Sequence, residues 1–530
     1  MASVIEVTSR TPRDRCCRVA GLLALLLFSI VGARAEDVSP PGDQQPVATP
    51  SGQKSGAAGV RGNTASSPAA EQHRLPPDST TKQTLALPGR TLAFTATAGS
   101  IRLFNDKGEP QADIAYTAYQ LDDDAEARAR PVTFLFNGGP GAASAYLQFG
   151  DAGPWRLAIN GDAAISSASP DLQPNAETWL DFTDLVFIDP VGTGYSRFVA
   201  TGDDVRKRFF SVDGDVNSIA LTIRRWLEKS NRLLSPKYIV GESYGGIRGP
   251  KIVRNLQTEQ GVGVRGLILV SPMLDFREFT GSSILQYVWS LPTMAAVARE
   301  TKGSVTAADM ADVERYARGD FLVDLVKGEA DAEATARLAD KVAALTGIDQ
   351  AVSRRLAGRF DVTEFRREFD RKNGRVTGRY DASISGFDPY PDSSYFHFND
   401  PSGEPLTAPL TSAAVDLTTR KLNWRPDGSY ELLSGAVERA WDFGRGLNPA
   451  ESISQLRQIL ALDPKLKVLV VHGLFDLATP YFGSKILLDQ LPAYATRERV
   501  KLVVYPGGHM FYSRDASRQA FRAEAAALMK

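Results

Sequence analysis

The most informative segment of the sequence is Tyr238-Ile239-Val240-Gly241-Glu242-Ser243-Tyr244-Gly245. Its first three residues form an apolar run that predicts a strand, and residues 252–256 carry apolar side chains at helical spacing. A serine between glycines, with a strand before it and a helix after it, is typical of the sharp turn that presents a nucleophilic hydroxyl. An ordinary glycine-rich loop is the alternative, because Gly-x-Ser-x-Gly alone is a weak pattern. We predict that Ser243 is a nucleophile.

Apolar runs and helical repeats alternate along most of the chain. Continuous runs of Val, Ile, Leu and Phe suit strands that are buried on both faces, as in a parallel sheet. Such runs occupy residues 132–136, 185–188, 267–270, 468–471 and 502–505. Helical repeats lie at about residues 216–227, 453–462 and 518–529. Strands that alternate with helices predict an α/β fold with a central, mostly parallel sheet.

Changes in composition divide the chain beyond its first 35 residues. Residues 36–82 are rich in Pro, Gly, Ala, Ser and Gln, which predicts a disordered linker. Residues 83–280 then form the first part of the α/β core, and residues 431–530 form its second part. Between them, residues 281–430 break the alternation with Ala-rich, charged helical segments. We expect this insertion to be largely helical and to cap the site.

The first 35 residues are typical of a secretory signal peptide. Four arginines precede the apolar residues 19–31, a stretch that is short for a membrane span, and Ala-Arg-Ala at 33–35 provides a cleavage site. We expect an exported chain, secreted or periplasmic, with no membrane span after cleavage; an uncleaved anchor is the alternative. The only two cysteines, Cys16 and Cys17, would be removed with the signal. The mature chain would then contain no disulfide and no thiolate nucleophile.

A serine nucleophile needs a base, and the chain has four histidines. His73 lies in the predicted linker, and His397 lies in the predicted insertion. His472 ends a strand, which favours a packed or turn-stabilising residue. His509 follows a strand in the loop Pro506-Gly507-Gly508-His509-Met510. We therefore predict that His509 is the base, with a surface loop histidine as the alternative.

The base in turn needs a carboxylate that fixes its tautomer and stabilises the imidazolium. Asp476 follows the strand at residues 468–471, in the segment His472-Gly473-Leu474-Phe475-Asp476. This gives the chain order Ser, Asp, His that is typical of α/β-hydrolases. The alternative is that Asp476 or Asp489 caps the N-terminus of a helix. We favour Asp476 as the third member because its loop directly follows a core strand.

With these residues and the motifs given below, the sequence resembles the serine carboxypeptidase family. The signal-like N-terminus suggests a bacterial, exported member of that family. Five motifs carry the resemblance, in the family's order, over roughly residues 130–512. They are Asn137-Gly138-Gly139-Pro140-Gly141, Asp151-Ala152-Gly153-Pro154, Asp189-Pro190-Val191-Gly192-Thr193-Gly194-Tyr195-Ser196, residues 241–246 and Gly508-His509-Met510. The resemblance implies an α/β-hydrolase fold, a helical insertion, and removal of residues from the C-termini of peptides through an acyl-enzyme intermediate.

The resemblance also implies roles for individual residues. The backbone amides of Gly139 and Tyr244 would form the oxyanion hole. The terminal carboxylate of the substrate would be held by Asn137, Gly138, Glu242 and Asp151. Two nearby carboxyl groups cannot both ionise cheaply, so we expect Glu242 and Asp151 to share a proton and to donate it in a hydrogen bond to the substrate. A partly exposed charge near a helix start is the alternative for Glu242.

Other functions are possible for the same residues. An esterase, an amidase or an acyltransferase would use the same Ser243, Asp476 and His509, because the acyl-enzyme is common to all of them. A noncatalytic exported binding protein is a third possibility. The formal net charge of −1 gives no electrostatic reason to expect a nucleic-acid partner. With the histidines assigned as above, we expect peptides as substrates, no metal site and no cofactor.

Overall fold

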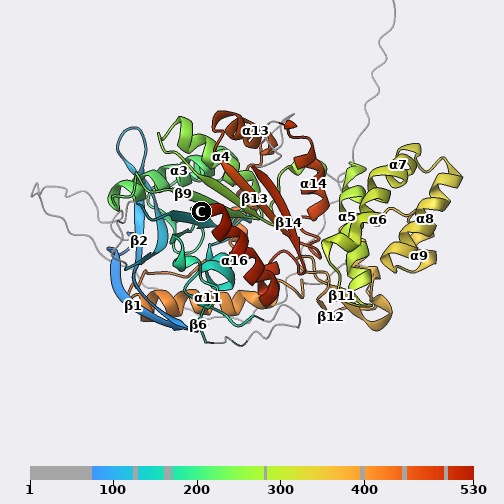
Figure 1. Cartoon of the computed structure of the whole chain (residues 1–530), viewed down its shortest axis with the longest axis horizontal. Coiled ribbons are helices and arrows are strands. Elements are labelled where there is room, and N and C mark those ends of the chain that lie inside the picture. The colour runs from blue at the N-terminus through green and yellow to red at the C-terminus, as the bar shows by residue number, and fades with distance from the viewer. Residues whose placement is uncertain are drawn as a thin grey trace, which may run out of the picture. The chain divides into compact units, whose positions relative to one another are not determined.

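The structure of the chain is a computed structural model (Figure 1). It describes residues 74–122, 129–159, 168, 171–279, 283–393, 400–444, 450–493 and 499–530. The predicted signal peptide and most of the predicted linker, His73 included, lie outside these residues, and so does His397 of the predicted insertion. Among the residues that the structure describes, no helix combines the length and apolarity needed to cross a membrane.

One central sheet organises the described part of the chain (Figure 1). Its strand order is β1-β2-β3-β7-β4-β9-β10-β13-β14, and the short β8 also pairs with β3. The bounds are β1 Ser79–Leu87, β2 Arg90–Phe104, β3 Pro110–Leu121, β4 Val132–Phe136, β7 Asp184–Ile188, β8 Arg197–Phe198, β9 Lys237–Glu242, β10 Gly266–Val270, β13 Lys467–Gly473 and β14 Val500–Tyr505. Pairing is antiparallel from β1 to β7 and parallel from β7 to β14.

Helices cover both faces of this sheet, which explains the unbroken apolar runs in its central strands. Alternate residues of β10 show this most simply: Leu267 and Leu269 pack in one hydrophobic cluster, and Ile268 and Val270 pack in another. The first cluster includes side chains from α3 (Val212–Lys229), α4 (Gly245–Thr258) and α13 (Ile453–Leu462). The second includes side chains from α11 (Thr407–Asp416) and α16 (Asp515–Met529). A strand between two such layers has no polar face.

Residues 281–430 contain most of the remaining helices, as predicted. The bounds are α5 Leu285–Glu300, α6 Ala311–Tyr316, α7 Leu322–Lys327, α8 Ala332–Thr346, α9 Gln350–Arg355 and α10 Val362–Glu368, followed by the hairpin of β11 Arg375–Thr377 and β12 Ser385–Phe387. These helices have a hydrophobic cluster of their own, which Phe475 and Phe482 of the core join. The last α-helix of this segment, α11, does not join that cluster. Its Leu410 packs in the same hydrophobic cluster as the central strands.

Shorter elements connect these layers. They are α1 Ala145–Leu147, β5 Trp155–Arg156, β6 Gln173–Pro174, α2 Asp203–Phe209, α12 Gly435–Ala440 and α14 Tyr481–Asp489. The order and direction of the strands match the predicted α/β architecture with a mostly parallel sheet. The loops that follow β4, β9, β13 and β14 carry the predicted site residues, and the carboxyl ends of parallel strands meet at one edge of a sheet.

The boundary of the predicted linker at residue 82 is wrong. β1 begins at Ser79, and Leu75 is already buried. The polar run Ser79-Thr80-Thr81-Lys82 suggested a solvated segment, but it pairs with Thr95 to Ala98 of the long strand β2. The pairing partner lies outside the composition window that suggested disorder, so composition alone placed the boundary too late.

Candidate active site

Ser243 occupies a strained turn between β9 and α4. Its φ angle is +60°, in the left-handed region that a non-glycine residue rarely adopts. The turn is held because the Ser243 N–H donates to the Val270 carbonyl at 2.9 Å and the Met273 N–H donates to the Ser243 carbonyl at 2.9 Å. A Cβ atom on Gly241 would lie 2.6 Å from the Gly245 carbonyl oxygen, which leaves no room for a side chain there. The sequence therefore folds locally into the predicted strand–turn–helix arrangement.

Asp476 and His509 come from the loops after β13 and β14 and meet in the buried interior. His509 Nδ1 lies 2.7 Å from Asp476 Oδ2. The other carboxylate oxygen, Oδ1, accepts the backbone N–H groups of Ala478 and Thr479 at 2.8 and 3.0 Å. A carboxylate fixed in this way favours a proton on Nδ1, which leaves Nε2 of His509 free to accept one.

Two opposing effects act on the pKa of His509. Burial alone would lower the pKa, because the charged ring loses its hydration. The charge and the hydrogen bond of Asp476, with a smaller contribution from Glu242, outweigh burial and hold the pKa above the ordinary value. The charged form of the His509 ring is thus stabilised by Asp476.

His472 and Asp489, the other described candidates for these two roles, lie in different surroundings. His472 is buried, its Nε2 lies 2.9 Å from Ser484 Oγ, and burial lowers its pKa to about 4. It is a packed neutral residue, as the sequence indicated. Asp489 is the last residue of α14 and pairs with Arg318 at 2.7 Å.

The insertion holds the loop of His509 in place, which the sequence did not indicate. The His509 N–H donates to the Tyr380 carbonyl at 2.5 Å, and the Leu477 N–H donates to the Arg379 carbonyl at 3.1 Å. The rings of Tyr380 and His509 lie 5.1 Å apart. A Cβ atom on Gly508 would lie 2.1 Å from the Tyr380 carbonyl oxygen. Gly508 is therefore required by the close approach of two backbones.

The loop after β4 lies directly against the turn of Ser243. A Cβ atom on Gly138 would lie 2.5 Å from the Tyr244 backbone nitrogen and 2.8 Å from Ser243 Cβ. Within the described residues, the backbone N–H groups of Gly138, Gly139 and Tyr244 have no hydrogen-bond acceptor. Amides that are held rigidly and left without a partner beside a nucleophile suit the stabilisation of a developing oxyanion.

Glu242 is buried between two hydrogen-bond donors. The Tyr512 hydroxyl donates to Glu242 Oε2 at 2.9 Å, and the side chain of Asn137 also bonds to this carboxyl group. Burial raises the pKa of Glu242 to about 7, although these two donors and His509 act in the opposite direction. Tyr512 is a partner that the sequence did not suggest; its only signal was its position three residues after His509.

Asp151 is fully buried, and neither of its carboxyl oxygens has a hydrogen-bond partner in the described structure. Burial raises its pKa well above the ordinary value, the charge of Arg518 opposes the shift, and the charge of Glu242 adds to it. The two carboxyl groups are thus coupled electrostatically, as the shared-proton hypothesis requires. The described hydrogen bonds of Glu242 go to Tyr512 and Asn137, so a proton shared directly with Asp151 stays a prediction.

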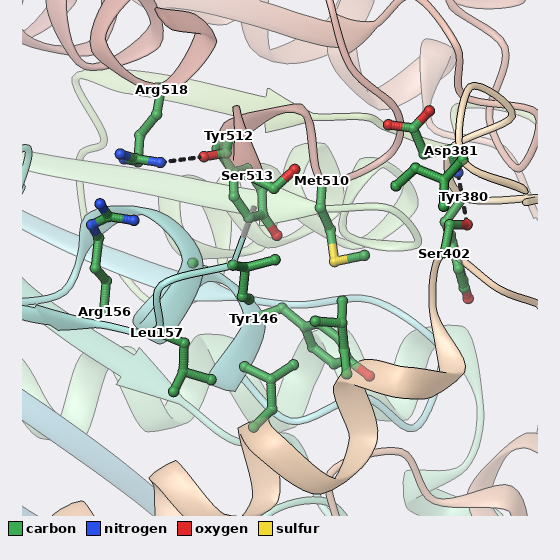
Figure 2. Close-up of a pocket in the computed structure, with 15 residues that line it drawn as sticks. Tyr146, Arg156, Leu157, Tyr380, Asp381, Ser402, Met510, Tyr512, Ser513 and Arg518 are labelled. Carbon is green, nitrogen blue, oxygen red and sulfur yellow. Dashed lines mark hydrogen bonds between the residues drawn. The ribbon is translucent and has the colours of Figure 1, made fainter. Parts of the chain in front are cut away.

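These groups open into one pocket of about 320 Å³. Its lining includes Asn137, Gly138, Gly139, Glu242, Ser243 and His509, and from the insertion Arg366, Arg379, Tyr380, Asp400 and Glu404. A second cavity shares Tyr146, Tyr380 and Met510 with it (Figure 2). That cavity holds only about 30 Å³, the room of about one water molecule. Of these two cavities, the larger one is lined by both Ser243 and His509.

Comparison with known proteins relates part of the chain to one enzyme family. Residues 91–321 match the serine carboxypeptidase family. The chain is 28% identical to serine carboxypeptidase-like 29 of Arabidopsis thaliana over 179 residues, which cover 31% of this chain and 34% of that protein. It is 29% identical to carboxypeptidase sxa2 of Schizosaccharomyces pombe over 167 residues, which cover 30% of this chain and 29% of that protein. The chain thus aligns with about a third of the length of these relatives, and the family match ends before Asp476 and His509.

A solved structure extends the likeness in fold beyond that region. A prohormone-processing carboxypeptidase of Saccharomyces cerevisiae superposes with a TM-score of 0.53, covering 82% of this chain and 91% of that one, at 14% sequence identity. This likeness confirms the predicted α/β-hydrolase fold.

Proposed function

We propose that this chain is a serine-type carboxypeptidase, which hydrolyses the last peptide bond of a substrate through an acyl-enzyme intermediate. Ser243 is the nucleophile, His509 is the general base, and Asp476 orients the histidine. The observation that carries the proposal is the buried Glu242 beside Ser243, with its pKa of about 7 and its donors Tyr512 and Asn137. A general serine hydrolase has no need of a protonated carboxyl group next to its nucleophile.

The chemistry follows from the geometry of the pocket. His509 Nε2 takes the proton of the Ser243 hydroxyl as the serine oxygen attacks the carbonyl carbon of the last peptide bond. The amides of Gly139 and Tyr244 bind the negative oxygen of the tetrahedral intermediate, and one such donor is typically worth about 3 kcal/mol. The leaving amine takes the proton from His509. A water molecule, activated by the same histidine, then releases the acyl group from Ser243.

The free carboxylate of the substrate would bind at the other end of the pocket. The Gly138 N–H, Asn137 and the protonated Glu242 are the groups proposed to hold it. Asp151 is the second carboxyl group of the proposed site, and burial and the charge of Glu242 raise its own pKa. A carboxyl group that keeps its proton near neutral pH donates a hydrogen bond to an anion instead of repelling it. The substrate class is therefore peptides with an unmodified C-terminus.

Two matched peptides test the proposal. An N-blocked peptide with a free C-terminus should lose its last residue, and the same peptide with a C-terminal amide should be a much poorer substrate, both measured by mass spectrometry. Ser243→Ala should abolish the reaction, and a fluorophosphonate should label the parent chain but not this variant. Equal cleavage of both peptides would instead indicate an amidase, and labelling of Ser243 without cleavage of either peptide would indicate an esterase or an acyltransferase. A folded chain that resists labelling would indicate a noncatalytic binding protein.

Export is part of the same proposal. The basic, apolar and Ala-Arg-Ala segments within residues 1–35 support a signal peptide and a secreted or periplasmic enzyme of bacterial origin. We also propose the five-part division of the chain given above, in which residues 281–430 form an insertion that caps the site. N-terminal sequencing of the exported protein tests the first point, with Glu36 as the expected first residue.

A further inference from the structure

Arg248 is a fully buried arginine in α4, one turn beyond Ser243. Its Nε donates to Asp215 Oδ2 at 2.6 Å, and its Nη1 donates to the backbone carbonyl of Asn137 at 2.5 Å. Its guanidinium carbon lies 5.4 and 5.1 Å from the ring centres of Phe136 and Tyr244. One side chain thus joins the nucleophile helix to the loop after β4.

The contact with the Asn137 carbonyl determines where the next N–H points. A trans peptide unit is planar, so its C=O and its N–H point in opposite directions. When Arg248 holds the Asn137 oxygen in the protein interior, the Gly138 N–H must point in the opposite direction within the same plane, away from Arg248. Gly138 lines the pocket, and its N–H has no acceptor within the described residues.

The side chain of Asn137 is held independently of Arg248. Its Oδ1 accepts the Leu147 N–H at 3.1 Å. Loss of Arg248 would therefore free the Asn137–Gly138 peptide plane to rotate while this side-chain contact remained. Rotation of that plane would withdraw the Gly138 N–H from the pocket.

A buried cation needs a counter-charge, and Asp215 supplies it from the first turn of α3. Because the ion pair is neutral as a unit, Arg248 acts on the loop through geometry and not through net charge. The guanidinium offers several donors in a fixed plane, so it can bond to Asp215 and Asn137 at the same time. A lysine ammonium has no such planar fork.

We infer that Arg248 is a positioning residue, which fixes the Asn137–Gly138 peptide so that the Gly138 N–H binds the terminal carboxylate of the substrate. The inference rests on the proposed carboxypeptidase function. Its alternative is a buried ion pair that only stabilises the fold. The two differ in what they predict for a substrate that carries a carboxylate and for one that does not.

The experiment compares an N-blocked peptide with a free C-terminus and the same peptide with a C-terminal amide, which share one scissile bond. The variants are Arg248→Lys, which keeps the charge, and the double variant Arg248→Met with Asp215→Asn, which removes both charges and avoids an unpaired buried aspartate. We expect KM for the free peptide to rise about ten- to a hundredfold, and KM for the amide to change little. The preference for a free terminus should therefore largely disappear in both variants.

Arg254→Met in the same helix is the matched control, because no side-chain bond of Arg254 is described, and it should keep the parental preference. Thermal melting and fluorophosphonate labelling of Ser243 show whether each variant is folded. Folded, labelled variants that keep the parental ratio, or that lose both substrates in proportion, would overturn the positioning role. A parent that shows no preference for the free terminus would refute the proposed function first, and the inference with it.

Discussion

The hydroxyl of Tyr512 donates a hydrogen bond of 2.9 Å to Oε2 of Glu242, across 270 residues of sequence. Both side chains are buried. The hydroxyl stabilises the ionised form of Glu242, whereas burial destabilises it more, so the pKa of the carboxyl group lies at about 7. Glu242 therefore changes its charge in the neutral pH range, beside the proposed nucleophile.

This pKa predicts how peptide binding depends on pH. Below about pH 7 Glu242 is protonated and donates to the substrate carboxylate; above it the two negative charges repel. KM for a peptide with a free C-terminus should therefore rise as pH increases through 7, and Glu242→Gln, which cannot ionise, should remove this rise. Tyr512→Phe removes a donor that favours the carboxylate, so the pKa should increase and the rise should move to higher pH. Steady-state kinetics from pH 5 to 9 measures KM for the parent, for Glu242→Gln and for Tyr512→Phe.

The amidated peptide provides the control, because it has no terminal charge for Glu242 to repel. Its KM should vary little over the same range. An alkaline rise of the same size in Glu242→Gln and in the parent would assign the effect to another group.

Glu242 also predicts a cost in stability. In the unfolded chain it should have the ordinary glutamate pKa of 4.5, and in the folded chain about 7. Below pH 4.5 both states hold the proton. Between 4.5 and 7 only the folded state holds it, so stability falls as pH rises, and above 7 the full cost of burying the charge remains. Glu242→Gln should therefore be more stable than the parent at pH 8, by roughly 1–3 kcal/mol.

Urea unfolding at pH 8 and at pH 4.5 measures this difference. The stabilisation by Glu242→Gln should be largest at pH 8 and mostly absent at pH 4.5. An equal stabilisation at both pH values would show that a difference in packing, and not the ionisation of Glu242, accounts for the difference in stability between the variant and the parent.

The sequence predicted the central strands and the loops that carry the proposed catalytic residues, because both have a local pattern in the chain. The central strands were recognisable because they are buried on both faces and therefore apolar along most of their length. The loops after β9, β13 and β14 were recognisable because close backbone approaches require glycine, as at Gly241 and Gly508. Since these loops follow parallel strands, their predicted proximity required no knowledge of the insertion.

Residues that act through long-range packing were missed. Tyr512 is 270 residues from Glu242, and Arg248 bonds to a carbonyl 111 residues away. Tyr380 comes from the insertion, where the sequence has no motif that links it to His509. The one local sign of Arg248's role was an arginine in the segment Gly246-Ile247-Arg248-Gly249-Pro250, directly after the glycine-rich turn. Arginine rarely lies in an otherwise apolar helix face.

Asp476→Asn tests the role of the carboxylate that orients His509. An asparagine of the same size can present its amide N–H to Nδ1, which favours the tautomer with its proton on Nε2 and so removes the base. We expect kcat to fall about 10³- to 10⁴-fold with KM nearly unchanged, and the rate of fluorophosphonate labelling of Ser243 to fall with it.

Thr479→Val provides the comparison. The Thr479 hydroxyl donates to Asp476 at 2.7 Å, but two backbone donors to Asp476 would remain, so its effect should be far smaller. Unchanged labelling in a folded Asp476→Asn chain would exclude Asp476 from the proton transfer.

Gly508→Ala tests whether the insertion positions the base. A Cβ atom at this position would lie 2.1 Å from the Tyr380 carbonyl oxygen and 2.4 Å from Asp381 Cβ, so the loop and the insertion must separate. The His509 N–H would then lose its 2.5 Å bond to Tyr380, and the imidazole would move relative to Ser243. A displacement of about 1 Å in such a site can cost about a hundredfold in rate, so kcat should fall by that order. Gly263→Ala is the matched control, because nothing lies within 4 Å of a Cβ atom there, and it should leave kcat unchanged. Comparable activity of the two folded variants would show that the contact with Tyr380 does not determine where His509 lies.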